Sequence, residues 1–264
     1  MSQPVLPSIT GKSTKQINIL LVNPNGTSFM TEACLRSLED SLPPYCTVTG
    51  FTSPHPAPSA IEGHMDAVLS AAAAIRAIIP IAHNYDAFLV ACFSAHPLIN
   101  ALREELTGPV IGIMEASFYT ARMLGARLGV VATSGRSKIM HEDAIRLYGF
   151  EGYSVGCEAT GLGVLELETQ PKDKVLGLMA ETARKLVQDK GADCITLGCA
   201  GMTEMKAKCE EVVGTKEGAA QVIDGVAVGV QLLIALVREG HHTAKGGLYR
   251  SSAEGRKARG QDWI

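Results

Sequence analysis

Short apolar runs alternate along the chain with longer segments in which apolar residues recur at steps of three and four. The short runs are rich in branched residues and predict strands at residues 17–22, 47–51, 87–92, 110–114, 128–132, 152–157, 194–198 and 221–223. The longer segments, such as residues 64–83 and 172–190, predict amphipathic helices. Because strands and helices alternate, we expect βαβ units with right-handed crossovers and mostly parallel sheets.

The order of these elements occurs twice. Residues 18–30 align without a gap on residues 128–140, and each of the two runs is a predicted strand that leads into a loop. Later in each half, a strand-like run starts with an aspartate and reaches a cysteine six residues on, at Cys92 and at Cys199. We therefore expect an α/β protein with two pseudo-symmetric lobes, each a mostly parallel sheet flanked by helices, and an active site in the cleft between them.

The repeat also predicts how the chain is divided. The expected parts are a flexible N-terminal tail at residues 1–16, a first lobe at 17–113 that a helix at about 225–240 completes, a second lobe at 114–224, and a flexible C-terminal tail at 245–264. The tails are expected to be mobile because they carry few core-forming residues. An alternative for the second tail is that Trp263 docks on a neighbouring subunit.

Composition narrows the class of protein. The chain has 264 residues, of which 46% are hydrophobic and 19% charged, so it can bury a sizeable core. Its formal net charge of −3 gives no general attraction to nucleic acid or to an anionic membrane. The longest apolar runs, such as residues 223–237, fall short of the about 20 residues that span a bilayer. The amino terminus has no apolar signal core, and we expect a cytoplasmic protein.

Seven cysteines are spread along the chain without a compact pattern. This favours a reducing compartment over a disulfide scaffold, and no CxxC or Cys/His set predicts a metal site. Small buried hydrophobes are the expected role of five of them, which are Cys34, Cys46, Cys157, Cys194 and Cys209. Cys92 and Cys199 differ because they occupy equivalent positions of the repeat, at strand ends where α/β proteins bind ligands.

Three segments resemble the signatures of a known family. They are LVNPNGT at residues 21–27, ACF at 91–93 and LGCAGM at 197–202. Together they are similar to the aspartate/glutamate/hydantoin racemase superfamily, specifically its hydantoin and allantoin racemase branch, over about residues 17–240. The resemblance implies an isomerase that uses no cofactor. It also implies that Cys92 and Cys199 act on opposite faces of the substrate, one as thiolate base and the other as thiol acid.

Chemistry supports these two roles independently of the resemblance. The proton on C5 of a hydantoin is flanked by a carbonyl and a nitrogen, so its removal gives a delocalised enolate. A free thiol has a pKa of about 8.5, and the site must therefore favour one thiolate while it keeps the other thiol protonated. Helix amino termini after both strands are expected to supply positive potential. Neutral hydrogen-bond donors would stabilise the enolate oxygen.

The neighbours of the cysteines indicate the substrate class. Amino-acid racemases of the superfamily place Asn-Thr after the first cysteine and Thr-His after the second, whereas this chain has Phe93-Ser94 and Ala200-Gly201. The loss of these polar groups disfavours a free amino acid and favours a neutral, planar ring against Phe93. We expect 5-substituted hydantoins or allantoin as substrates.

The candidate substrate-binding residues are Asn23, Phe93, Ser94, Glu115, Thr133, Ser134, Gly198, Ala200, Gly201 and Met202. Asn23 has an equal claim to a turn role, since Asn-Pro-Asn-Gly is typical of turns and caps. The alternative for Glu115 is a first-turn helix acid. Many hydantoin racemases have an acidic pair after Cys-Phe, whereas this chain has Ser94-Ala95-His96-Pro97. His96 either polarises a ring carbonyl or sets thiol protonation, or it is a helix cap or surface residue. The other histidines are expected to be solvated.

Other functions remain open at this point. One is racemisation of an amino acid or isomerisation of another activated carbon acid, such as a cyclic dipeptide. Another is a binding protein that kept the fold and lost turnover, although the presence of both cysteines argues against it. The expected partners are a small neutral cyclic ureide or amide and further copies of the chain, because alanine-rich helices and the family resemblance suggest a homo-oligomer.

Overall fold

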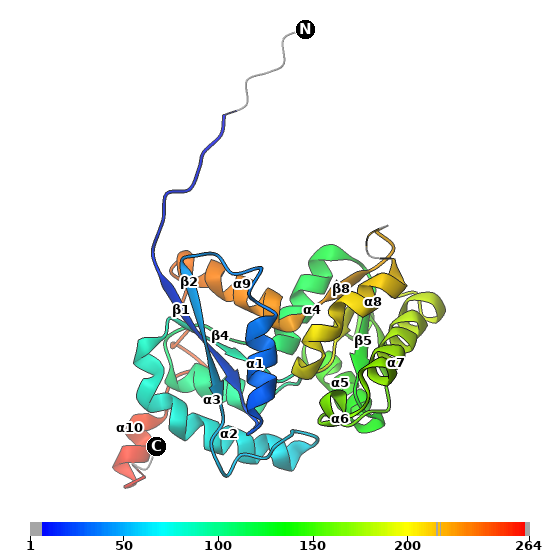
Figure 1. Cartoon of the computed structure of the whole chain (residues 1–264). Coiled ribbons are helices and arrows are strands. Elements are labelled where there is room, and N and C mark those ends of the chain that lie inside the picture. Colours follow the sequence, from blue (N-terminus) through cyan, green and yellow to red (C-terminus); the bar gives the residue numbers. More distant parts are fainter. Residues whose placement is uncertain (1–6, 215, 217, 262–264) are drawn as a thin grey trace.

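The structure is a computed structural model that describes residues 7–214, 216 and 218–261. Its described strands form two four-stranded sheets in the orders β2-β1-β3-β4 and β6-β5-β7-β8. Every pair is parallel, and the central strands β1 and β5 occupy equivalent places (Figure 1). The strands are β1 (Ile17–Asn23), β2 (Cys46–Thr52), β3 (Ala87–Val90), β4 (Val110–Gly112), β5 (Leu128–Ala132), β6 (Ser154–Ala159), β7 (Cys194–Leu197) and β8 (Gln221–Ile223). The predicted α/β fold with two similar lobes is confirmed.

Helices follow nearly every strand, as the alternating pattern predicts. The α-helices are α1 (Ser28–Arg36), α2 (His64–Ile78), α3 (Pro97–Glu105), α4 (Ile113–Leu124), α5 (Gly135–Leu147), α6 (Glu166–Thr169), α7 (Lys172–Arg184), α8 (Lys206–Val213), α9 (Gly225–Arg238) and α10 (Ala253–Ala258). Shorter helical segments are η1 (Ile79–Asn84), η2 (Glu151–Tyr153), η3 (Lys185–Asp189) and η4 (Ala200–Met205). The segment η3 is a π-helical continuation of α7, and η1 continues α2 as a 3-10 helix.

The central strands of each sheet are buried on both faces, which explains why they are mostly apolar. In β1, Ile19 and Leu21 face a core shared with α4 and α9, whereas Leu20 and Val22 face a second core under α2 and α3. The shared core continues into the second sheet through residues such as Val130. A third core lies between the second sheet and α7 and α8. The shared core thus joins the two lobes on one side of the molecule.

Three strand ends differ from the sequence prediction in a way that affects the site. The strand β4 ends at Gly112, and α4 begins at Ile113, because β4 pairs only with β3 and β3 ends at Val90. The strand β3 ends at Val90, so Cys92 lies just beyond the sheet rather than within it. The strand β7 ends at Leu197, one residue earlier than predicted, and Cys199 also lies just beyond the sheet. The equivalence of the two cysteines is preserved.

The helical segment His64–Asn84, formed by α2 and η1, is long and apolar enough to cross a membrane by length and composition. The expectation that no segment reaches this length was therefore wrong, because it counted only unbroken apolar runs. The same segment buries Ala74, Ile78 and Ala82 in the core of the first lobe. Packing within the fold accounts for this buried face, whereas Met65, Val68 and Leu69 of the same segment are exposed.

The C-terminal segment lies beside α3 (Figure 1). Arg256 forms an ion pair with Glu105 at 2.7 Å, and Ser251 donates a hydrogen bond to the same carboxylate. Lys245 donates hydrogen bonds to backbone carbonyls at the end of α3. Trp263 lies outside the described residues, and the expected mobility of this tail stays a prediction.

Candidate active site

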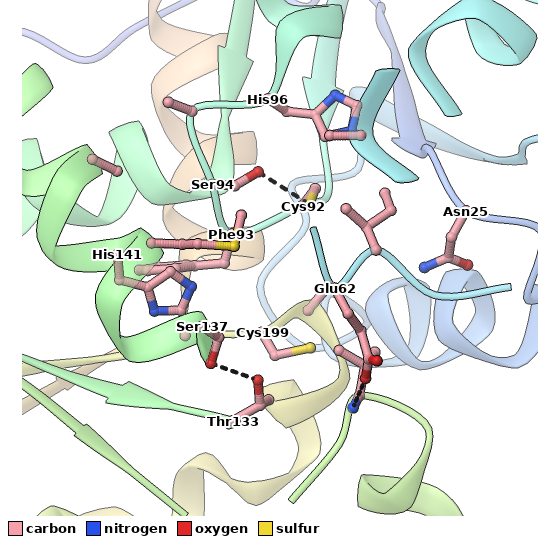
Figure 2. Close-up of a pocket in the computed structure, with 18 of the residues that line it drawn as sticks. Asn25, Glu62, Cys92, Phe93, Ser94, His96, Thr133, Ser137, His141 and Cys199 are labelled. Carbon is pink, nitrogen blue, oxygen red and sulfur yellow. Dashed lines mark hydrogen bonds between the residues drawn. The ribbon is translucent and has the colours of Figure 1, made fainter. Parts of the chain in front are cut away.

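The two lobes enclose a cavity of about 420 Å³. Its wall is built from loops at the carboxyl ends of equivalent strands, with Cys92 after β3, Cys199 after β7 and Thr133 after β5 (Figure 2). The carboxyl ends of parallel strands are where open α/β sheets bind ligands. The pseudo-symmetry therefore brings one thiol from each lobe to the same cavity.

Cys92 belongs to a tight turn that follows β3. The backbone N–H of Ser94 donates to the Cys92 carbonyl, and the Ser94 hydroxyl lies 3.3 Å from the Cys92 sulfur. Burial raises the pKa of the Cys92 thiol to about 12, the Ser94 hydroxyl lowers it, and the nearby Cys199 raises it. The helix α3 begins only at Pro97, so no helix amino terminus follows Cys92 directly, contrary to the sequence expectation.

Cys199 lies at the start of the 3-10 helix η4. Burial raises the pKa of its thiol to about 11, the backbone N–H of Gly201 lowers it, and the carboxylate of Glu62 raises it. With both pKa values above the ordinary range, both thiols are protonated at neutral pH in the unliganded protein. A thiolate must therefore form by loss of one proton from the pair.

Gly198 gives Cys199 its position. A Cβ at residue 198 would lie 2.4 Å from the carbonyl oxygen of Val131 and 3.0 Å from Cε1 of His141. The Gly198 backbone N–H also donates to this Val131 carbonyl at 2.8 Å. Only a residue without a side chain fits between β5 and α5 at this point, and the absence of a Cβ lets the Cys199 loop lie close to both.

The structure brings half of the candidate substrate-binding residues to the cavity and leaves the others elsewhere. Those in the wall are Phe93, Ser94, Thr133, Gly198 and Ala200. Those outside it are Asn23, Glu115, Ser134, Gly201 and Met202. Gly201 remains close to the chemistry because its backbone N–H acts on the Cys199 thiol.

Asn23 holds the turn after β1. Its amide donates to the side chain of Asn25 at 3.0 Å, to the carbonyl of Thr27 at 3.0 Å and to the hydroxyl of Thr31 at 3.1 Å. The structure thus gives Asn23 the turn role, and the neighbouring Asn25 lines the cavity instead. The sequence did not single out Asn25, because the end of the strand determines which asparagine lines the cavity.

Three further candidates have structural partners away from the cavity. Glu115 lies in the first turn of α4 and forms an ion pair with Arg103 at 2.7 Å, which agrees with the alternative role of a helix acid. Ser134 caps α5 by accepting a hydrogen bond from the Ser137 backbone N–H at 3.1 Å. Met202 is fully buried in the core of the second lobe.

His96 caps α3 and joins it to α2. Its Nδ1 accepts a hydrogen bond from the Leu98 backbone N–H at 3.2 Å, and its Nε2 lies 3.1 Å from the hydroxyl of Ser70. Burial lowers the pKa of His96 to about 4, so the ring is neutral at physiological pH. The capping alternative is therefore the one that the structure shows, although one edge of the ring also reaches the cavity.

His141 is a buried residue of the cavity wall that the sequence interpretation missed. It was expected to be solvated, yet it lies in α5 with its ring 5.2 Å from that of Phe93, edge to face. Burial lowers its pKa to about 4, and among the described residues its Nδ1 has no hydrogen-bond partner. Its helical spacing to the buried Ala144 and Ile145 was the signal that could have placed it on the inner face.

The rest of the wall is mostly apolar. It includes Met30, Ile61, Ala67, Met140, Ala144 and Leu147. Two carboxylates, Glu62 and Asp143, also line it, whereas no lysine or arginine does so among the described residues. The described part of the chain also contains no cluster of three or more His, Cys, Asp or Glu residues that could hold a metal ion.

Comparison with known proteins adds independent information. The model of the Asp/Glu/Hydantoin racemase family matches residues 19–233. A hydantoin racemase of Rhizobium meliloti is 34% identical, and the match covers 88% of this chain and 94% of the racemase. An uncharacterized protein of Schizosaccharomyces pombe is 42% identical, and the match covers 89% of this chain and 98% of that protein. The crystal structure of an allantoin racemase from Pseudomonas fluorescens superimposes with a TM-score of 0.81 at 28% identity, over 89% of this chain and 97% of that one.

Proposed function

The chain belongs to the Asp/Glu/hydantoin racemase family and is an isomerase, and we propose that it racemises neutral cyclic ureides through Cys92 and Cys199. The substrates that we propose are 5-substituted hydantoins or allantoin. The observation that carries this proposal is the placement of the two thiols. Each lies just beyond an equivalent strand, one from each lobe, and both line one cavity.

In the proposed reaction, the thiolate of one cysteine removes the proton from the stereocentre of the ring. The electron pair of the broken C–H bond moves into the adjacent carbonyl and gives an enolate. The other cysteine, still a thiol, donates its proton to the opposite face of the same carbon. The product has the opposite configuration, and the two sulfurs have exchanged protonation states. A proton transfer through solvent then restores the starting state.

The polar groups around the sulfurs suit this exchange. The Ser94 hydroxyl lies 3.3 Å from the Cys92 sulfur, and the backbone N–H of Gly201 acts on the Cys199 sulfur. Each thiolate would therefore have one hydrogen-bond donor, which offsets part of the cost of burying its charge. These donors lower the pKa of each thiol, while burial still holds both pKa values above the ordinary range.

The lining favours a neutral ring over a free amino acid. An α-carboxylate normally needs a positive charge or several polar donors, and the described wall holds two carboxylates with no lysine or arginine. Phe93 presents a flat apolar surface next to Cys92, and it is held edge to face by His141 and Phe118. A planar ureide ring can stack there while its polar edges meet backbone groups.

We predict that a 5-substituted hydantoin or allantoin is racemised at least about a hundredfold faster, in kcat/KM, than aspartate or glutamate, since placing a carboxylate in this wall leaves its charge unpaired. Loss of optical rotation from single enantiomers at equal concentration measures both. Faster racemisation of aspartate or glutamate would contradict the proposed substrate class.

We also propose that the protein is a homo-oligomer. Large apolar side chains are exposed on the surface of the single chain, including Met65 on α2 at 70% and Met123 on α4 at 70%. Such side chains favour burial against another copy. Light scattering should then give a mass above the 27.9 kDa of one chain. A mass equal to that of one chain would remove this proposal and leave the catalytic one unaffected.

A further inference from the structure

Glu62 is a charged residue of the cavity wall that neither the sequence motifs nor the proposed proton transfer uses. It lies in the loop between β2 and α2, two residues before α2 begins. Its backbone N–H donates to the carboxylate of Asp66 in the first turn of α2, at 3.0 Å. The backbone of Glu62 is thereby attached to the first lobe, and its side chain extends along the cavity (Figure 2).

The Glu62 side chain reaches the second lobe. Its Oε1 accepts a hydrogen bond from the backbone N–H of Val164 at 3.2 Å, and Val164 also lines the cavity. Beside it, Gly63 lies against the guanidinium group of Arg136 in α5, which would be 2.5 Å from a Cβ at residue 63. The start of α2 thus contacts the second lobe at the cavity, away from the core that joins the lobes.

The charge of Glu62 acts on the Cys199 side of the cavity. Among the described residues, Glu62 forms no ion pair, and no lysine or arginine lines the wall to neutralise it. Its carboxylate is one of the groups that raise the pKa of the Cys199 thiol. A ligand beside Cys199 therefore meets a negative charge that has a single backbone partner.

We propose that Glu62 determines substrate specificity by accepting a hydrogen bond from an N–H group of a neutral ligand and by repelling ligands that carry a carboxylate. The hydrogen bond with Val164 is exposed to solvent. When the Glu62 carboxylate binds a ligand instead, a water molecule can accept the hydrogen bond from the Val164 N–H. A carboxylate accepts hydrogen bonds but cannot donate them. It therefore distinguishes a ureide ring, which presents N–H groups, from its ring-opened acid, which presents a negative charge.

This inference deepens the proposed function and rests on it for the identity of the ring, but its test does not need turnover. The probes are 5-benzylhydantoin and N-carbamoylphenylalanine, which share a side chain and differ in ring closure and charge. Their equilibrium dissociation constants would be measured by calorimetry for the native protein and for Glu62→Gln. Glutamine keeps the length of the side chain and can still accept from Val164, so the lobe contact is retained.

A matched control is available on the same second-lobe loop. The carboxylate of Glu166 accepts a hydrogen bond from the backbone N–H of Gly163 at 2.7 Å, one residue before Val164, and Glu166 is outside the cavity wall. Glu166→Gln removes the same charge from nearly the same place without changing the wall. It separates a general change of the loop from a direct effect on the ligand.

In Glu62→Gln, the preference for the hydantoin over the open-chain acid should fall at least about tenfold, whereas in Glu166→Gln it should stay within about twofold of the native value. A preference that is unchanged in Glu62→Gln, or that falls equally in both variants, would overturn the assignment. Failure of the native protein to racemise the hydantoin that it binds would instead count against the proposed function, so the two ideas can fail separately.

Discussion

Replacing either Cys92 or Cys199 with serine is expected to lower the interconversion of enantiomers by about a thousandfold, within the range that a positioned acid or base contributes. A serine hydroxyl has a far higher pKa than a thiol, so the variant loses the base on one face and a competent acid on the same face. Each variant keeps one thiol. It can therefore remove and return the proton of a single enantiomer without completing the inversion.

Cys46→Ser is the matched control for these variants. Cys46 is a half-buried cysteine at the start of β2 and is outside the cavity wall, so its replacement should leave the rate within about twofold of normal. Circular dichroism would show that all three variants are folded. Interconversion near the native rate in both Cys92→Ser and Cys199→Ser would rule out the two-thiol assignment.

The activity should also rise steeply with pH. Burial raises the pKa values of Cys92 and Cys199 to about 12 and about 11, so at neutral pH both thiols are protonated. The fraction with one thiolate then increases about tenfold for each pH unit as long as the pH stays below the first macroscopic pKa of the pair. We expect kcat/KM to increase by about a hundredfold between pH 6.5 and 8.5.

The measurement is the initial rate of racemisation across this range, with the ionisation of the substrate's own N–H groups followed in parallel. Of the three histidines that line the described wall, His96 and His141 stay neutral across this range, since burial lowers their pKa values to about 4; the third, His64, lies at the start of α2. A rate that is flat from pH 6.5 to 8.5 would mean that a thiolate is already present at neutral pH. It would contradict the protonation states proposed here.

The sequence predicted most of the fold because its strands are buried on both faces. Runs such as Ile17–Asn23, in which only Asn18 is exposed, and Leu128–Ala132 are almost continuously apolar, and this pattern is read without knowledge of the partner strands. The two cysteines were identified for the same reason. Their equivalence is a property of the repeat, and it does not depend on how the side chains around them are turned.

The remaining side chains of the site depend on contacts between distant segments. Whether Asn23 or Asn25 faces the cavity is decided by where β1 ends and by the hydrogen bonds of the following turn. Glu115 lies outside the cavity wall because β4 ends at Gly112, level with the end of its partner strand β3. The helix α4 begins at the next residue, so Glu115 lies in its first turn beside Arg103. Glu62 is in a loop without periodicity, and its partner is 102 residues away.

Incubation of one pure enantiomer of a 5-substituted hydantoin in heavy water tests the central claim most directly. A cysteine thiol carries a single proton, so the proton taken from one face stays on that sulfur, while the opposite sulfur delivers a solvent-derived deuteron. At early times, once the exchange that occurs without enzyme is subtracted, the product enantiomer should carry deuterium at the stereocentre. The remaining substrate should carry almost none. Equal deuterium in both enantiomers from the start, or racemisation without deuterium in the product, would contradict proton transfer between two thiols.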